Sequence, residues 1–393
     1  MSDPITAIVD HAEKLLAEGR SKDAVSILVA QTRLHQDCFN LWYCLGRAHF
    51  LGGEHFEAER AFRAALELRG DVPDAHYNLA VSLIYQDKLS ESIEYFLGAR
   101  RLNPRNPEVR KALLKTLFTL LQRDGASEAF RGRKLAPLIE HPLASVIVPT
   151  QNRLPLLGDA LSSVHRQSHP DWEVIVANDG GESISPLLES LPRDLRQRVR
   201  AIDLPTTRGP AAARNQAIKL AKGDVVTFLD DDDRYLPDHL RCLISGLRGT
   251  NAAMAYTATE LVRESVHGGV REELGRQRFQ PGFRYSRPLL LVGNFIPINA
   301  WGVRRECFDA VGMFDESLHF LEDWDFLLRV SDQFDIHQID AVTAEYRVTE
   351  RANDSVSKRH SHREGVEAIH RRHPARGLER VLLARKIYLE TLA

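Results

Sequence analysis

The first third of the chain carries a pattern of small and bulky apolar residues that recurs every 34 positions. In the two clearest copies the matching residues are Trp42, Leu45, Gly46, Ala58, Phe62 and Ala65, then His76, Leu79, Ala80, Ser92, Phe96 and Ala99. Weaker copies begin at Ile8 and Arg110. Small residues where helices cross, with bulky ones a turn away, let an antiparallel helix pair pack closely. The pattern therefore predicts a stack of helix pairs.

This period and spacing resemble the tetratricopeptide repeat, most specifically between residues 5 and 106. Stacked helix pairs share a continuous core and leave a concave groove. The resemblance implies a groove that holds a peptide or protein acceptor, or a partner protein. Two alternatives stay open: the repeats pack on the rest of the chain, or they mediate self-association into a homo-oligomer.

Beyond residue 143, short apolar runs alternate with stretches of helical spacing. Strands are expected over 144–149, 172–177, 199–204 and 224–229, and helices over 156–166 and 209–221. Continuously apolar strands that alternate with helices predict a parallel sheet buried on both faces. The expected fold class is α + α/β. The expected parts are a helical repeat domain over 1–122, a linker over 123–142 and an α/β domain over 143–393.

Composition narrows the class of protein. The chain is 43% hydrophobic and 27% charged, as in soluble globular proteins, and its net charge of -2 argues against binding to nucleic acid or through a polybasic membrane surface. No run approaches the roughly 18 apolar residues that a membrane span needs. The four cysteines form no Cys-x-x-Cys spacing, and the N-terminus has no signal-peptide pattern. A cytoplasmic protein is expected.

The run Asp230–Asp233 directly follows the apolar stretch Val225–Leu229 and is the strongest chemical signal. Adjacent carboxylates raise one another's pKa. A hard cation that bridges to phosphate oxygens offsets this repulsion, and carboxylates suit Mg²⁺ or Mn²⁺. A second acidic group, Glu322–Asp325, comes about 90 residues later. One group to hold a metal–diphosphate and one to accept a proton suffice for transfer from an activated donor, whereas the alternative is a solvated acidic loop.

Polar residues gather at three strand ends, over 149–153, 178–181 and 230–233. Ligands of parallel sheets bind beyond the carboxyl ends of the strands. Three polar groups at one sheet edge therefore predict a single binding site.

The motifs 145–153, 176–181, 208–215, 228–233 and 314–325 look like those of family 2 glycosyltransferases of GT-A fold. They occur in order between about residues 143 and 350. The resemblance implies a Rossmann-like, mostly parallel sheet, a nucleotide-sugar donor, a divalent metal and inversion at the anomeric carbon.

By resemblance, the loop with Pro149, Asn152 and Arg153 and the carboxylate of Asp179 hold the nucleotide. Asp179 would accept from the N–H of a uracil-like ring; its alternative role is that of a turn aspartate before two glycines. A UDP-sugar is the expected donor, although Gln151 stands where the family usually has tyrosine.

Two arginines of the third motif also belong to the implied nucleotide site. Arg208 and Arg214 would touch the base or the diphosphate, because a guanidinium suits phosphate. The alternative for Arg214 is a structural ion pair.

Within the acidic run, the resemblance makes Asp232 the metal ligand. Asp230 or Asp231 would bind ribose or complete the metal coordination through water. Asp233 is expected to cap the following helix. Few protein ligands are expected, because diphosphate and water fill the other positions of the metal.

Asp323 is the implied catalytic base, which takes the proton of an acceptor hydroxyl. Glu322 would hydrogen-bond the acceptor, and Trp324 would form an apolar wall on the acceptor side that keeps Asp323 poised. The alternative for the two carboxylates is an interaction with the helix dipole. The segment 293–303 is expected to line the acceptor side, with Asn294, Asn299 and Trp301; the alternative for Trp301 is a place in the core.

The sequence therefore predicts a metal-dependent inverting glycosyltransferase, with a protein acceptor held by the repeats. One alternative is a polysaccharide or lipopolysaccharide glycosyltransferase whose repeats dock it onto an assembly. The other is a binding scaffold with an inactive transferase domain.

Overall fold

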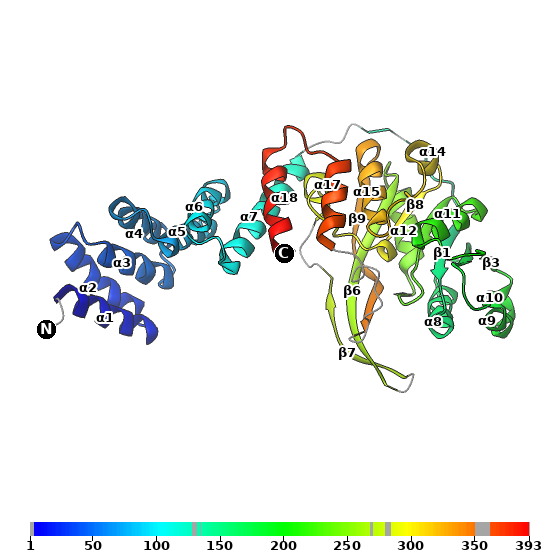
Figure 1. The fold of residues 1–393 in the computed structure, drawn as a ribbon, viewed down its shortest axis with the longest axis horizontal. Helices are drawn as coiled ribbons and strands as arrows, with labels where there is room; N and C mark the ends of the chain where they lie inside the picture. Colours follow the sequence, from blue (N-terminus) through cyan, green and yellow to red (C-terminus); the bar gives the residue numbers. More distant parts are fainter. Residues whose placement is uncertain are drawn as a thin grey trace. The chain divides into compact units, whose positions relative to one another are not determined.

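The chain forms two compact units in the computed structural model, shown in Figure 1. The repeat unit comprises the residues up to Arg123 together with Lys386–Thr391, and the sheet unit comprises Asp124–Arg385. The sequence placed Lys386–Thr391 in the second part, so the C-terminal end differs from that expectation. The structure describes residues 4–127, 132–133, 135–267, 270–279, 284–349 and 362–392.

The repeat unit is built from consecutive helix pairs. Its helices are α1 (Pro4–Ala17), α2 (Ser21–Leu34), α3 (Phe39–Leu51), α4 (His55–Leu68), α5 (Pro73–Tyr85), α6 (Leu89–Leu102) and α7 (Pro107–Ser127). The pairs α1–α2, α3–α4 and α5–α6 confirm the predicted stacking. The weak fourth copy differs, because α7 continues to Ser127 where a second helix was expected. Part of that copy, including Phe130, lies outside the described residues.

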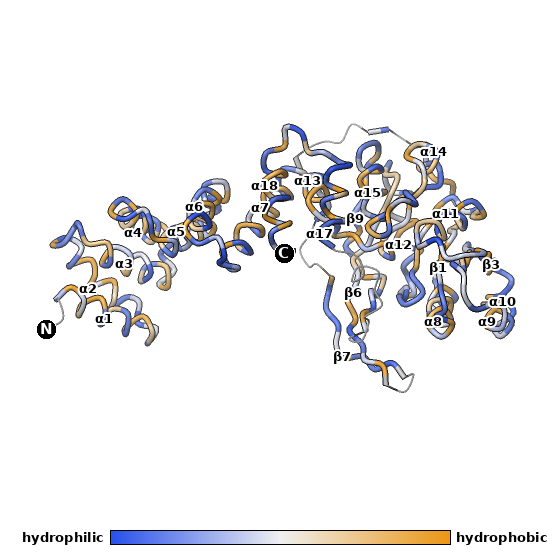
Figure 2. Tube along the Cα trace, in the orientation of Figure 1, coloured by the Kyte–Doolittle hydropathy of each residue, from blue (hydrophilic) through white to orange (hydrophobic). Residues whose placement is uncertain are grey.

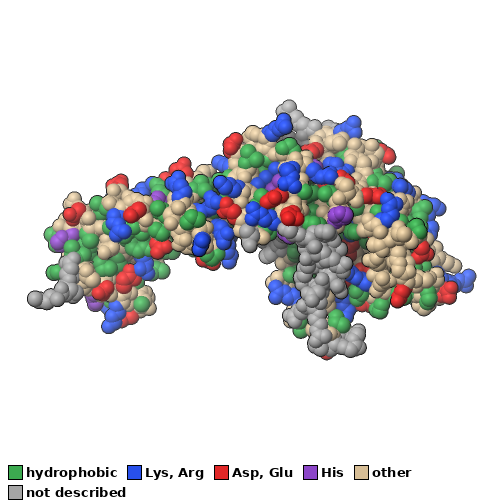
Figure 3. Space-filling view, in the orientation of Figure 1, with side chains coloured by type: hydrophobic (Ala, Val, Ile, Leu, Met, Phe, Trp, Pro, Cys, Tyr) green, Lys and Arg blue, Asp and Glu red, His purple; other side chains and the backbone are tan. Residues whose placement is uncertain are grey.

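Small residues of the repeat unit, among them Gly46 of the 34-residue pattern, allow aromatic rings of neighbouring helices to approach closely. A Cβ at Gly46 would lie 2.6 Å from the ring of Phe62, and one at Gly98 would lie 2.7 Å from the ring of His76. Phe62 and Phe96 are fully buried at equivalent positions of successive copies. The 34-residue pattern thus encodes the helix crossings of this unit. On the face shown in Figure 3, acidic and basic side chains are interspersed over the repeat helices.

The end of α18 (Glu379–Thr391) completes the repeat unit. Arg100 Nε donates to the carboxylate of Glu390 at 3.1 Å, and Arg110 donates to the Glu390 carbonyl at 2.9 Å. The rings of Phe118 and Tyr388 lie 6.5 Å apart. These contacts hold the C-terminal segment against α6 and α7.

The sheet unit contains one nine-stranded sheet with the order β3-β2-β1-β4-β8-β6-β9-β5, and β7 pairs with β6. Its strands are β1 (Ala144–Thr150), β2 (Trp172–Asn178), β3 (Val199–Asp203), β4 (Val225–Phe228), β5 (Arg234–Tyr235), β6 (Met254–His267), β7 (Val270–Arg278), β8 (Trp301–Arg304) and β9 (Ile336–Thr349). The four strands predicted from the sequence are confirmed as β1 to β4. The largely hydrophilic β7 forms a hairpin with β6 (Figure 2).

The predicted fold class, helical repeats followed by an α/β domain, is confirmed, and the sheet is mixed instead of mostly parallel. β1, β2, β3 and β4 are parallel, as are β6 and β9. β8 runs antiparallel to both β4 and β6, β5 to β9, and β7 to β6. Because β8 is antiparallel to β4, the start of β8 lies beside the end of β4. This arrangement brings the segment before β8 to the acidic run.

Helices surround this sheet. They are α8 (Leu154–His165), α9 (Ser185–Ser190), α10 (Arg193–Arg196), α11 (Pro210–Leu220), α12 (His239–Arg248), α13 (Arg287–Leu290), α14 (Cys307–Val311), α15 (Glu322–Gln333) and α17 (His362–Arg372). A short 3₁₀ helix, Ile298–Ala300, precedes β8. The predicted helices 156–166 and 209–221 correspond to α8 and α11.

Apolar residues of the central strands fill the core. Val146 and Val148 of β1 and Val174 and Val176 of β2 are fully buried, and they pack with residues of α8 and α12. In the described ranges, no helix combines the length and the apolar character that a membrane crossing needs.

Candidate active site

The acidic run forms a turn directly after β4, in which the Asp233 N–H donates to the Asp230 carbonyl at 3.0 Å. The turn leaves two of the four side chains partly exposed and buries the other two. Those of Asp230 and Asp232 are 32% and 36% exposed, whereas Asp231 and Asp233 are buried. The two exposed carboxylates are the two predicted metal ligands.

Asp231 points into the protein instead of toward a ligand. Its carboxylate accepts from Thr150 Oγ1 at 2.7 Å and from Arg153 at 3.2 Å. Burial raises the pKa of Asp231 to about 6, although the charge of Arg153 opposes that rise. The residue therefore fastens the acidic turn to the end of β1, and its burial argues against the predicted ribose contact.

Asp233 is a second internal anchor. It accepts from Asn299 Nδ2 at 2.7 Å and from the main-chain N–H of Arg347 at 2.9 Å. Burial and the charge of Asp232 raise the pKa of Asp233 well above its usual value. This corrects the predicted cap, because β5 follows Asp233 and α12 begins only at His239.

Arg153 joins the buried and exposed parts of the acidic run. It donates to Asp232 at 3.0 Å as well as to Asp231, and 39% of its side chain is exposed. Burial and the charge of Asp230 raise the pKa of Asp232, while Arg153 and then Arg271 oppose that rise. A guanidinium at this place is compatible with the predicted role of Arg153 in nucleotide binding, because a guanidinium suits phosphate.

The loop after β1 is held by close packing against a glycine. Asn152 adopts a φ of 55°, and its Oδ1 accepts from the Glu182 N–H at 2.8 Å. A Cβ at Gly181 would lie 2.1 Å from Asn152 Oδ1. Pro149, the other predicted nucleotide residue of this loop, lies in β1 beside Ala177 of β2. The Asn-Asp-Gly-Gly motif thus shapes the loop where the nucleotide base is expected.

Asp179 orders the segment that leads into α11. Its two carboxylate oxygens accept from the main-chain N–H groups of Arg208 and Gly209, both at 2.8 Å. Gly209 has a φ of 91°, a conformation that favours glycine. Each oxygen keeps a second lone pair. The turn role and the base contact remain compatible, while the Arg208 side chain donates to Glu316 at 2.7 Å.

Arg214 bridges the two acidic groups of the site. It is buried, and its guanidinium donates to Asp230 at 2.6 Å and to Glu322 at 2.5 Å. Asp230 follows β4, and Glu322 opens α15. The structural ion pair considered from the sequence is therefore present, and it brings together two motifs that are far apart in the chain.

Asp323 lies in the first turn of α15. Its Oδ2 accepts from the Asn294 amide at 2.9 Å, and its Oδ1 accepts from the Trp324 N–H at 2.7 Å. Burial, followed by the charge of Glu322, raises the pKa of Asp323 to about 7. A carboxyl group with this pKa is suited to accept a proton near neutral pH. Leu321, which precedes the helix, has a φ of 62°.

Three residues predicted on the acceptor side are core residues. Trp301 is fully buried and stacks on Phe326 with ring centroids 5.7 Å apart. Asn299 is fully buried and also donates to the Glu345 carbonyl at 3.1 Å. Trp324 is 1% exposed, and its Nε1 donates to the Leu290 carbonyl at 2.8 Å. This burial corrects the prediction, because none of the three side chains presents a surface to an acceptor.

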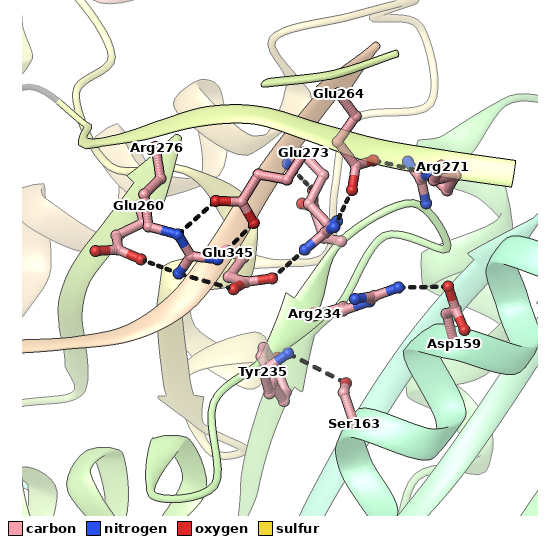
Figure 4. Close-up of polar contacts among 12 residues, drawn as sticks. Asp159, Ser163, Arg234, Tyr235, Glu260, Glu264, Arg271, Glu273, Arg276 and Glu345 are labelled. Carbon is pink, nitrogen blue, oxygen red and sulfur yellow. Dashed lines mark hydrogen bonds and ion pairs between the residues drawn. The ribbon is translucent and has the colours of Figure 1, made fainter. Parts of the chain in front are cut away.

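A buried ionic network beside the acidic run was missed by the sequence reasoning (Figure 4). Glu264 is 1% exposed and pairs with Arg271 at 2.7 Å and with Arg347. Arg347 also pairs with Glu345, and Arg276 pairs with Glu345 at 3.4 Å. The strands β6, β7 and β9 supply these residues. Only the alternation of charged residues along 260–278 hints at it in the sequence.

The predicted metal site can be tested against these contacts. In the part of the chain that the structure describes, no group of three or more His, Cys, Asp or Glu residues is arranged to hold a metal. Of the four carboxylates of the acidic run, those of Asp230 and Asp232 are partly exposed. The repulsion between these two contributes to the raised pKa of Asp232. Two hard oxygen ligands fit Mn²⁺ or Mg²⁺ where phosphate and water supply the remaining positions.

A mixed sheet, an acidic turn at the end of β4 and a carboxyl group at the start of α15 together define a GT-A-like glycosyltransferase fold, preceded by helical repeats. Residues 145–312 match the family described as glycosyl transferase family 2. Residues 53–107 match the tetratricopeptide repeat. The chain is thus a glycosyltransferase that carries a family 2 domain and N-terminal tetratricopeptide repeats.

Curated relatives agree with this class. The chain is 29% identical over 213 residues to the uncharacterized glycosyltransferase YwdF of Bacillus subtilis. The matched stretch covers 54% of this chain and 76% of YwdF. The chain is 31% identical to the putative colanic acid biosynthesis glycosyl transferase WcaA of Escherichia coli, covering 48% and 66%. It is 32% identical to the putative teichuronic acid biosynthesis glycosyltransferase TuaG of Bacillus subtilis, covering 31% of this chain and about half, 49%, of that relative.

A solved structure shares the fold. The mannosyltransferase PcManGT from Pyrobaculum calidifontis, in complex with GDP-Man and Mn²⁺, aligns with a TM-score of 0.53 and 17% identity. The alignment covers 71% of this chain and 79% of that one. At this identity the likeness concerns the fold alone.

Proposed function

We propose that this chain transfers a sugar from a nucleotide-sugar to an acceptor hydroxyl, with inversion and with a divalent metal. The observation that carries the proposal is the position of Arg214, which donates to Asp230 at 2.6 Å and to Glu322 at 2.5 Å. The acidic turn for the diphosphate and the helix that bears Asp323 are therefore neighbours. A leaving group and a proton acceptor are both needed in one site for such a transfer.

Asp232 and Asp230 would hold the metal through their exposed oxygens. When bound, Mn²⁺ or Mg²⁺ neutralises the charge that develops on the departing diphosphate. The Mn²⁺ of the mannosyltransferase complex supports this choice of metal. Arg153, which already donates to Asp232, would add positive charge on the same side.

Asp323 would act as the base. It takes the proton of the acceptor hydroxyl while that oxygen forms a bond to the anomeric carbon. The bond between the anomeric carbon and the diphosphate oxygen breaks on the opposite face, so the configuration inverts. The pKa of about 7 leaves a large fraction of Asp323 ionised at neutral pH. Glu322 is bound to Arg214, so it would support the base instead of touching the acceptor.

The nucleotide would lie across the ends of β1 and β2. Pro149, Asn152 and Asp179 would surround the base, and Arg153 and Arg208 would approach the diphosphate. A UDP-sugar remains our first candidate donor. The GDP-mannose of PcManGT makes a GDP-sugar the second.

The acceptor has two candidate classes. A repeat groove suits a polypeptide, either as the acceptor itself or as a docking partner. The printed names of WcaA and TuaG refer to colanic acid and teichuronic acid biosynthesis, which favours a polysaccharide acceptor for the second class. With a polysaccharide acceptor, the repeats would dock the enzyme onto an assembly complex.

Nucleotide release from UDP-, GDP- and dTDP-sugars with Mn²⁺ tests the proposal without an identified acceptor, because water can replace the acceptor slowly. Release from one donor, and its loss on removal of the metal with EDTA, supports a metal-dependent transferase. Failure of every donor both to bind and to release nucleotide overturns the proposal and favours a binding scaffold.

A further inference from the structure

The contacts of Arg214 support a further inference, which rests on the proposed function and deepens it. The side chain is only 5% exposed, and the carboxylates of Asp230 and Glu322 engage Nη2 and Nη1. Nε donates no hydrogen bond among the described residues. The guanidinium carbon also lies 6.0 Å from the centre of the Phe314 ring. Arg214 is thus fixed on several sides and has little room for a ligand.

These contacts argue against the nucleotide contact predicted for Arg214. A phosphate could reach the guanidinium only by displacing one of two carboxylates that are already paired. Such a displacement would deprive the released carboxylate of its partner, which is unfavourable in a largely buried site. Arg153 and Arg208 are also paired with carboxylates, but each through one Nη atom. Because their side chains are 39% and 48% exposed, a phosphate can approach the rest of either guanidinium without breaking those pairs.

The fork of Arg214 instead joins two elements that do not pair in the sheet. Asp230 belongs to the turn after β4, and Glu322 is the first residue of α15. A planar guanidinium fixes both distance and direction, which a flexible ammonium does not. The preceding Leu321 adopts a left-handed φ of 62°, a strained conformation that persists only where the surroundings hold it.

We propose that Arg214 is a positioning residue that sets the place of Asp323 relative to the acidic turn. By holding Glu322, it fixes the start of α15 and with it the neighbouring carboxyl group. By holding Asp230, it fixes the same guanidinium to the turn that would bind the metal–diphosphate. The distance between the attacking oxygen and the departing diphosphate is thereby fixed. Arg214 acts through these two carboxylates and does not touch the substrate.

The test uses the full chain, Mn²⁺ and the donor that the wild-type enzyme turns over. Arg214→Met keeps much of the volume and removes the fork, and Arg214→Lys restores the charge without the bidentate geometry. We expect Arg214→Met to reduce the rate of nucleotide release at saturating donor by roughly a hundredfold, the effect of a misplacement of about 1 Å. Nucleotide affinity is expected to stay close to that of the wild type, and Arg214→Lys to recover only part of the rate.

Arg329→Met is the matched control, because Arg329 lies on α15, the helix that Arg214 holds from α11 through Glu322. Arg329 donates to Asp325 at 2.8 Å and to the Met313 carbonyl at 2.8 Å, but it makes no contact with the acidic turn. Both arginines support α15, so a general loss of helix stability would slow both variants alike. We expect Arg329→Met to lower the melting temperature while the rate at saturating donor, measured well below that temperature, stays near that of the wild type.

A double-mutant cycle guards against a folding artefact. If Arg214 acts through Glu322, Arg214→Met and Glu322→Gln together should slow release by much less than the product of their separate effects. Nucleotide binding by each variant shows that the sheet unit is folded. Loss of affinity equal to the loss of rate, full recovery by Arg214→Lys, or independent effects in the cycle would each overturn the inference. A wild-type enzyme that neither binds a donor nor releases nucleotide would instead overturn the proposed function.

Discussion

The side-chain amide of Asn294 donates a hydrogen bond to Oδ2 of Asp323 at 2.9 Å. The amide orientation is itself fixed, because Asn294 Oδ1 accepts from the Ile296 N–H at 3.0 Å. A donor to a carboxylate stabilises its charged form. Asn294 therefore opposes the burial that raises the pKa of Asp323.

The rate of nucleotide release should depend on the protonation of Asp323. Only the ionised carboxylate can accept a proton, and burial raises its pKa to about 7. We therefore expect the rate at saturating donor to rise with pH through about 7 and to level off above it. A profile measured between pH 5 and 9 checks this, and a flat profile would contradict the role of Asp323 as base.

Asn294→Ala should move this profile to higher pH. The change removes a hydrogen bond to the charged carboxylate, so the pKa of Asp323 should rise further. The rate at pH 7 would fall, while the rate at pH 9 would fall less. Equal reduction at every pH would mean that Asn294 affects only the folding or the shape of the site.

Asp232→Ala should remove the Mn²⁺ dependence of nucleotide binding. The exposed oxygens of Asp232 would hold the metal that bridges to the diphosphate. Calorimetric titration with UDP or GDP, with and without Mn²⁺, measures this dependence. Asp340→Ala is a suitable control, since its side chain is 85% exposed and pairs only with Arg278 in the described contacts. Metal-dependent binding that survives in Asp232→Ala would refute the assignment.

Arg347→Leu should strongly destabilise the sheet unit. The change leaves the buried carboxylates of Glu264 and Glu345 short of a partner, at a cost of about 3–5 kcal/mol. Arg278→Leu breaks an exposed ion pair instead and should cost less than about 1 kcal/mol. The midpoints of urea denaturation of the two variants compare their losses of stability. Similar midpoints would show that the buried network contributes little to stability.

Gly46→Ala should destabilise the repeat unit although alanine favours helices. The new Cβ would lie 2.6 Å from the Phe62 ring, and overpacking typically costs about 1–3 kcal/mol. The gain in helix propensity is at most about 1 kcal/mol. Gly70→Ala, where the nearest atom is 3.6 Å away, should stay within about 0.5 kcal/mol. Thermal unfolding followed by circular dichroism checks the sign, and equal stability of both variants would contradict it.

Features encoded by near neighbours in the sequence were predicted well. The helix pairs follow from a 34-residue period, and β1 to β4 follow from uninterrupted apolar runs. The turn of Asp230–Asp233 was located because it directly follows such a run. Parallel pairing of β1 and β4 then explains why Thr150 meets Asp231.

Features that depend on distant partners were not predicted. Trp301 was placed near the acceptor, but its environment is set by Phe326, which lies far along the chain. Asn299 meets Asp233 because the short β8 runs antiparallel to β4, and no local pattern shows the direction of a strand. The pairing of Arg347 with Glu264 likewise joins positions 83 residues apart.

The most direct test of the account is the separation of binding and turnover in Asp323→Asn. Asparagine keeps the shape of the side chain but does not accept a proton as a carboxylate does. With the active donor and Mn²⁺, we expect nucleotide affinity to remain near the wild-type value and nucleotide release at saturating donor to disappear. Undiminished release, or an equal loss of affinity and release, would contradict the assignment of Asp323 as the catalytic base.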